Sequence, residues 1–235
     1  MIIASKNLRL PVVVFGELYA ACWLLQPWLT EKILHTDSNT SVTALVVFSV
    51  AWVGVIYGFF SLWSRGFCRI SWRELYVYVG MMSLIGPVGE VFVNSLCRLA
   101  TGSPLWEYRV LPVGHGDTSA YSFVAWSLYG FYFYLLQQRH NNIGGKNDGQ
   151  LALRVSVEGL ALEFLMNLSS LACLHVLVFY YFPPDMGHLT TLLAAPFYFL
   201  AGLLMVKTIK RFQIDPVFFG TLSLVISATF VFLCD

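Results

Sequence analysis

The sequence predicts an all-α fold, a polytopic membrane bundle of seven transmembrane helices built from repeated helical hairpins. The first observation behind this prediction is composition, because 57% of the 235 residues are hydrophobic and only 11% are charged, against roughly 25% in soluble domains. The second is that apolar residues gather in runs of about 20, the length that carries a helix across the hydrocarbon layer. The third is that lysine and arginine fall mainly in every second connection.

The apolar runs give the predicted helices in chain order. They cover residues 10–30, 42–64, 73–99, 118–138, 151–182, 188–209 and 216–234. The fifth run is long enough to contain a break. Merging or losing one helix would scatter the basic residues onto both membrane faces, so the charge pattern supports the number of spans.

Orientation follows from the basic residues. With a cytoplasmic N-terminus, eleven of the 14 lysines and arginines lie on the cytoplasmic side, and only Lys32, Arg98 and Arg109 lie outside. Short cytoplasmic loops are enriched in these residues. We therefore expect a multi-pass integral membrane protein with its C-terminus on the non-cytoplasmic side, in the endoplasmic reticulum if eukaryotic and the inner membrane if bacterial.

The spans group into one integral membrane domain, 1–235, made of three hairpins and a closing helix. The hairpins are 10–64, 73–138 and 151–209, the closing helix is 216–234, and the polar stretch 139–150 reads as a flexible cytoplasmic loop. The second and third hairpins align without a gap. The matched residues are Glu90, Asn94, Tyr108, Gly114, His115 and Thr118 with Glu163, Asn167, Tyr181, Gly187, His188 and Thr191.

Two acidic residues within the apolar runs are the leading candidates for function. A carboxylate in the bilayer costs a few kcal/mol or more, so Glu90 and Glu163 mark a site by default. Glu90 stands sixteen residues beyond Glu74, roughly 24 Å along a helix and in the outer half of the bilayer. We expect both acids to face one apolar chamber near the non-cytoplasmic surface. Glu17 and Glu158 fit structural pairing with hydroxyls or amides on neighbouring helices.

The outer loops add polar and aromatic residues above these acids. Asn94 and Asn167 stand one turn beyond the two carboxylates and, like the aromatic residues, are candidates for substrate binding. The catalytic candidates are Glu90, Glu163, His115 and Asp117, and those for substrate binding are Asn94, Asn167, Trp106, Tyr108, Trp126, Tyr181 and His188.

Other interpretations of the loop residues remain open. The aromatic residues also fit a belt at the headgroup level, and the histidines also fit solvated turns. His115, Asp117, Asp185 and His188 could hold a metal by ligand type, but their spacing is not diagnostic, and the cysteines show no ligand spacing. We expect neither a metal nor another cofactor.

Three segments resemble a known family. A carboxylate on a helix, then Leu105-Trp106-Glu107-Tyr108 and Gly116-Asp117-Thr118-Ser119-Ala120-Tyr121, is similar to the first half of the emopamil-binding protein or EXPERA domain. Gly187-His188-Leu189, opening an aromatic helix with Phe197-Tyr198-Phe199, resembles the second half, so the likeness covers residues 73–210. This family includes sterol double-bond isomerases.

The resemblance implies acid–base chemistry on a lipid double bond, with Glu90 matching the first catalytic Glu of the family. The chain departs from the pattern at two places. The family's His one turn before that Glu falls on Gly86, and the helix 123–136 carries no carboxylate. Glu163, Asp117 or His115 would then supply the missing base.

The residues themselves favour the same chemistry. A Glu in an apolar pocket suits protonation of an alkene or epoxide, and aromatic faces attract a developing cation. The leading hypothesis is an isomerase or cyclase of isoprenoid lipids, namely sterols, terpenoids or carotenoids, with Glu90 as acid and Glu163 or His115 as base. The expected partners are a lipophilic small molecule and membrane lipid, with no nucleic acid, and the oligomeric state stays open. The alternative is a non-enzymatic protein that binds or traffics lipid, or a small proton-coupled transporter.

Overall fold

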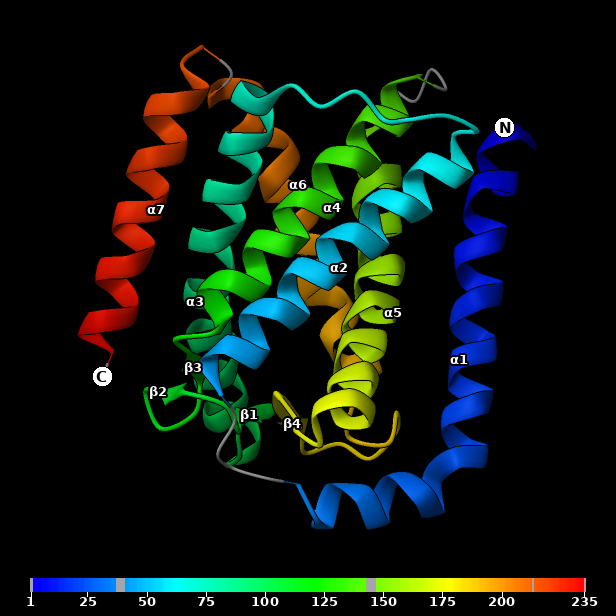
Figure 1. Ribbon diagram of the computed structural model, residues 1–235, viewed down its shortest axis with the longest axis vertical. Coiled ribbons are helices and arrows are strands. Elements are labelled where there is room, and N and C mark those ends of the chain that lie inside the picture. Colours follow the sequence, from blue (N-terminus) through cyan, green and yellow to red (C-terminus); the bar gives the residue numbers. More distant parts are fainter. Residues whose placement is uncertain (1, 37–40, 143–146, 213, 235) are drawn as a thin grey trace.

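The computed structural model describes residues 2–36, 41–142, 147–212 and 214–234, and over these residues the chain is a bundle of α-helices (Figure 1). The helices are α1 (Ile2–Leu34), α2 (Val42–Trp63), α3 (Trp72–Thr101), α4 (Ser122–Asn142), α5 (Asp148–Leu174), α6 (Ala195–Phe212) and α7 (Pro216–Leu233). The prediction of a helical fold is confirmed. Five of these helices, α2, α3, α5, α7 and α6 with the turn before it, are long and apolar enough to cross a membrane.

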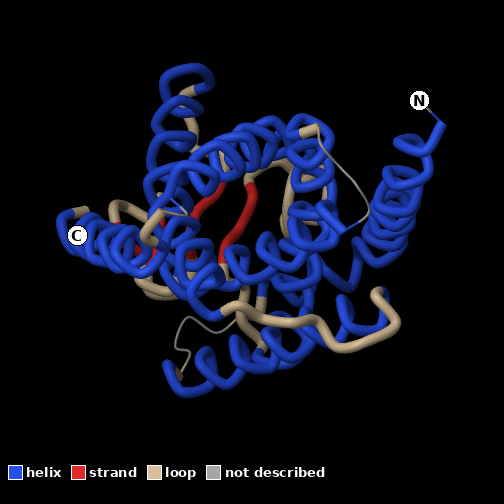
Figure 2. The backbone as a smooth tube through the Cα atoms, turned by 90° about the horizontal axis from the view of Figure 1, so that it is seen from above, coloured by secondary structure: helices blue, strands red, loops and turns tan. Residues whose placement is uncertain are grey.

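Two short antiparallel strand pairs interrupt the helical pattern. β1 (Trp106–Tyr108) pairs with β4 (Phe179–Tyr181), and β2 (Pro112–Val113) pairs with β3 (Thr118–Ser119). Figure 1 shows all four strands at the lower end of the bundle, and Figure 2 shows helices around them. The pairing of β1 with β4 confirms that the loops after α3 and α5 converge.

Strands and a turn correct three predicted helix boundaries. The predicted span 151–182 ends at Leu174 and continues into β4, 118–138 starts only at Ser122, and 188–209 starts at Ala195 after the turn η1 (Leu192–Ala194). The reason is that short apolar runs are compatible with a buried strand as well as a helix. His175 takes a left-handed conformation with φ 56° and closes α5 with its amide on the Ser170 carbonyl.

Helix packing groups α3 with α4 and α7, and α5 with α6 and α1. α3 approaches α7 closely, because a Cβ on Gly80 would overlap the Gly220 backbone and a Cβ on Gly220 would overlap Tyr76. Small residues commonly allow such close approach between membrane helices. α1 packs on α5, whereas α2 packs on α4. The predicted hairpin 10–64 is therefore not a closely packed pair, because each of its helices finds its main partner elsewhere.

Candidate functional site

A cavity of about 590 Å³ lies between α3, α6 and the paired strands β1 and β4. Its walls are almost entirely aliphatic and aromatic side chains, and its ionisable carboxylates are Glu90 and Glu163. Both carboxylates are buried, at 5% and 7% exposure. The two acids therefore line one apolar cavity, as the sequence predicts. The lining contains no lysine, arginine or histidine among the described residues.

The Glu90 carboxylate accepts hydrogen bonds from four side chains. The Tyr108 hydroxyl donates to Oε1. The Trp126 Nε1–H donates to the same oxygen, with 2.7 Å between the nitrogen and the oxygen. Thr118 at 2.6 Å and Ser122 at 2.7 Å donate to Oε2. An ionised carboxylate offers about four acceptor positions, so these donors match its charged form.

Gly86 makes room for the Trp126 indole. A Cβ built on Gly86 would overlap the Trp126 ring. The indole fills the place one turn before Glu90 and reaches the carboxylate from there. The position at which the resembled family has a histidine therefore cannot hold one in this chain while Trp126 keeps its place.

The Glu163 carboxylate has fewer partners. Tyr181 donates to Oε1 at 2.8 Å and Thr190 to Oε2 at 2.6 Å. The gap-free alignment pairs Thr118 with Thr191, but Thr191 instead donates to Asp185 at 3.1 Å. The loop after α5 is one residue shorter between its histidine and its threonine, so Thr190 occupies the position equivalent to Thr118.

Asn94 and Asn167, predicted to bind substrate, do not line the cavity and instead bind the backbone of the loops. Asn94 accepts from the Leu105 amide at 2.9 Å and donates to the Trp106 carbonyl at 3.0 Å. Asn167 donates to the Phe179 carbonyl at 2.8 Å and accepts from the Val178 amide at 3.2 Å. The physical reason is that each fully buried amide satisfies the backbone at the start of a strand and thereby fixes the tyrosine that follows.

Asp117, predicted to be catalytic, is held in a polar network outside the cavity lining. Arg98 forms a two-pronged ion pair with its carboxylate at 2.5 and 2.6 Å, and Asn94 donates to it at 3.0 Å. The Trp106 indole donates to the Asp117 carbonyl at 3.2 Å. Asp117 lies outside the cavity lining and its carboxylate is occupied by Arg98, so the geometry does not support the predicted role of Asp117 as the base.

The two histidines lie away from the cavity as well. His115 is exposed, takes φ 56°, and lines a second, smaller pocket. His188 stacks on Tyr180 with ring centroids 4.5 Å apart and bonds the Tyr181 carbonyl through Nδ1 at 2.7 Å. Neither histidine lines the cavity that holds the two carboxylates. The described residues also contain no cluster of three or more metal ligands.

Glu158 and Glu17 fall outside the cavity. Glu158 pairs with Arg154 one turn earlier and accepts from Tyr132, as a structural role predicts. Arg154 in turn lies over Trp63, with its Cζ 4.6 Å from the ring centroid. Glu17 is exposed on α1. Neither residue takes part in the site.

Aromatic rings form most of the wall next to the two acids. Trp106, Tyr108, Tyr181 and Trp126, all predicted to bind substrate, line the cavity. Sequence reasoning missed Ser122, Thr190, Phe179 and Tyr198, which are residue types too common in apolar helices and loops to stand out. The aromatic motif Phe197-Tyr198-Phe199 was the one available signal for Tyr198. The Tyr198 ring packs against Trp126, with 6.0 Å between the ring centroids.

The tyrosines on the two strands keep their protons. Burial raises the pKa of Tyr108 well above its usual range, and the neighbouring Glu90 carboxylate raises it further. Burial, followed by the Glu163 carboxylate, does the same to the pKa of Tyr181. Both phenols therefore remain hydrogen-bond donors to the carboxylates at any pH at which a membrane protein works.

Comparison with protein-family models, with curated proteins and with solved structures gave no match to this chain.

Proposed function

We propose that the protein is a membrane-embedded isomerase or cyclase that acts on an isoprenoid lipid by protonating it at one carbon and deprotonating it at another. One observation carries the proposal: two buried carboxylates from different helices line a single apolar cavity. General acid–base catalysis needs a proton donor and an acceptor held on either side of the reacting atoms. An apolar cavity selects a hydrocarbon-rich molecule to lie between them.

The two carboxylates suit different roles. Four donors fill the acceptor positions of Glu90 and favour its charged form, whereas Glu163 has two donors and keeps a position for its own proton. We therefore assign Glu163 as the acid and Glu90 as the base, which takes the substrate proton when the Thr118 or Ser122 hydroxyl rotates away from its carboxylate. This reverses the roles expected from the sequence and leaves His115 out, because His115 does not line the cavity.

Aromatic faces support a cationic intermediate. Protonation of an alkene or epoxide leaves positive charge on carbon, and the negative face of an aromatic ring attracts such charge. Trp126 packs against Tyr129 at 4.9 Å between ring centroids, and Tyr129 stacks on Tyr198 at 5.9 Å. Trp126 and Tyr198 both line the cavity. The charged Glu90 beside Trp126 would hold the cation in place until it loses a proton.

The cavity opens sideways, between α3 and α6. Several of its lining residues are also exposed on the outer surface, so they form an edge rather than a closed wall. They are Val88 at 40%, Phe92 at 62% and Leu96 at 42% on α3, with Leu200 at 59% and Leu204 at 51% on α6. Since these helices are apolar enough to lie in the bilayer, a lipid would enter here directly from the hydrocarbon layer.

Narrowing this opening is expected to slow lipid entry. Leu200→Trp places a bulky ring at the edge of the cavity, and we expect a several-fold fall in the rate of lipid conversion with the carboxylates intact. Leu99→Trp is the matched control, because Leu99 is 85% exposed on α3 and lies outside the lining. Equal rates in the two variants, measured by mass spectrometry of extracted lipids, would rule out entry between α3 and α6.

The proposed membrane arrangement has seven spans, including α1 and α4, with the N-terminus cytoplasmic and the strands at the non-cytoplasmic surface. We further propose that α3–α4 and α5–α6 are repeats. In support, Asn94 and Asn167 hold equivalent loops, and Tyr108 and Tyr181 bind equivalent carboxylates. His115 and His188 share left-handed φ values of 56° and 63°. The EXPERA resemblance is kept as part of this proposal.

Lipid analysis tests the proposed function. Isoprenoids extracted from cells with and without the protein are compared by mass and by double-bond position, which an isomerase changes without changing mass. A product that requires the protein and disappears in Glu163→Gln supports the enzyme. Unchanged lipids, together with an isoprenoid that copurifies with the protein, would favour the lipid-binding alternative.

A further inference from the structure

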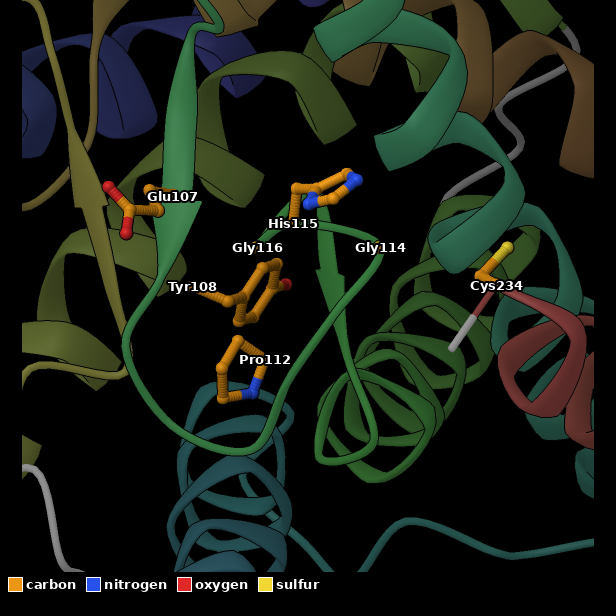
Figure 3. A pocket seen from close by; sticks show the side chains of 7 residues that line it. All are labelled: Glu107, Tyr108, Pro112, Gly114, His115, Gly116 and Cys234. Atoms are coloured by element: carbon orange, nitrogen blue, oxygen red, sulfur yellow. The ribbon is translucent and has the colours of Figure 1, made fainter.

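A second pocket, of about 290 Å³, lies at the strand end of the molecule (Figure 3). Its walls are more polar than those of the large cavity and are built by Glu107, Tyr108, Pro112, Gly114, His115, Gly116 and Cys234. His115 is exposed, and the Glu107 side chain is 39% exposed. Water can therefore reach this pocket from the non-cytoplasmic side of the proposed arrangement.

Tyr108 belongs to both cavities. Its side chain projects among the lining residues of the small pocket in Figure 3, and it also lines the large cavity. Its hydroxyl donates to the Glu90 carboxylate. The residue is 5% exposed and is fixed by the bond from its amide to the Gly116 carbonyl at 2.9 Å. One residue thus borders both the polar pocket and the apolar chamber that holds the Glu90 carboxylate.

We propose that Tyr108 is a proton relay between Glu90 and water in the small pocket. The inference rests on the proposed function, because it explains how Glu90 loses the proton that it takes from the substrate. Protonated Glu90 passes its proton to the Tyr108 oxygen while the Tyr108 O–H passes its own proton to a water molecule in the pocket. The phenol is unchanged afterwards, and Glu90 returns to its anionic form.

The other groups around Glu90 offer no route to water, so its proton leaves through Tyr108 to the small pocket. The other hydrogen-bond partners, Thr118 and Ser122, have no exposed surface, and the Trp126 indole can only donate. The large cavity opens to hydrocarbon rather than to water. Charged and titratable groups surround the proposed relay. The large cavity contributes Glu90 and Glu163, and the small pocket contributes Glu107, His115 and Cys234. The Arg98–Asp117 ion pair lies next to Trp106 of β1.

The second tyrosine provides a matched control. Tyr181 donates to Glu163 as Tyr108 donates to Glu90, and both are almost fully buried. Tyr181 lines the large cavity but not the small pocket. Loss of its hydroxyl should therefore leave proton exchange at Glu90 intact.

Labelling with dicyclohexylcarbodiimide tests the relay without a substrate. This apolar reagent modifies protonated carboxyl groups, and mass spectrometry of peptides distinguishes Glu90 from Glu163. The protein is placed in vesicles in which protease digestion has established its orientation, and the pH is lowered on one side at a time. We expect early labelling of Glu90 to rise when the pH falls on the side of the strands, and not when it falls on the other side.

The variants decide the role of the phenol. Tyr108→Phe should reduce the early rise several-fold, while labelling after full equilibration reports any change in proton affinity or folding. Tyr181→Phe should keep the rise. The relay is refuted by a Glu90 response that follows the opposite side, or by a normal early rise in Tyr108→Phe. A failed lipid assay with the expected labelling would instead refute the enzyme and keep the proton route.

Discussion

Glu163→Gln is expected to lower the rate of lipid conversion by about 10²- to 10⁴-fold, the usual contribution of a general acid. Glutamine preserves the size of the side chain and can still bond Tyr181 and Thr190, but it cannot deliver a proton to the substrate. The bound lipid should remain, because the cavity wall is otherwise unchanged. The measurements are product formation by mass spectrometry and the amount of lipid that copurifies with the variant.

Two further variants make this prediction specific. Glu90→Gln should lower the rate to a similar extent, because the amide neither accepts the substrate proton nor stabilises a cation as a carboxylate does. Glu17→Gln should have no effect, since Glu17 is exposed on α1 and outside the cavity. Normal conversion by both Glu163→Gln and Glu90→Gln would remove the acid–base mechanism.

Asn94→Ala is expected to destabilise the fold by about 2–5 kcal/mol. The substitution removes four hydrogen bonds, to the Leu105 and Trp106 amides, the Trp106 carbonyl and the Asp117 carboxylate. Each buried group left without a partner costs about 1–3 kcal/mol, although relaxation reduces the total. For a protein of this size the thermal midpoint should fall by about 5–15 °C, measured by thermal unfolding in detergent.

Ser95→Ala is the control for this prediction, because Ser95 is the next residue and is exposed. It should leave the midpoint unchanged. If Asn94 bound substrate instead, Asn94→Ala would unfold at the same temperature as the unaltered protein and lose only lipid binding. The two readings therefore give opposite results in one pair of measurements.

The helices could be predicted because the bilayer leaves few alternatives. An apolar run of 20 residues in hydrocarbon must satisfy its own backbone, and a helix does so within the segment. The boundaries near 118 and 182 could not be predicted in the same way. Phe179-Tyr180-Tyr181 is apolar whether it continues a helix or pairs as β4 with β1, and only the position of β1 decides between them.

The two acids could also be found from sequence, while their neighbours could not. Glu90 and Glu163 stand out because a buried carboxylate is costly. Ser122, Thr190 and Tyr198 carry no such cost and resemble ordinary helix or loop residues. Asn94 and Asp117 did stand out as polar, yet their roles depend on the Trp106 backbone and on Arg98, which the sequence does not place beside them.

The sequence by itself determined that this protein is helical and membrane-embedded, and that Glu90 and Glu163 are its exceptional residues, because these properties depend on local composition and on the cost of burying charge. The tertiary structure alone decided that both acids share one cavity, that His115 lies in another, and that Tyr108 borders both. Those facts depend on contacts between residues far apart in the chain, such as Trp126 in the space left by Gly86. Packing creates such contacts, and no local pattern specifies them.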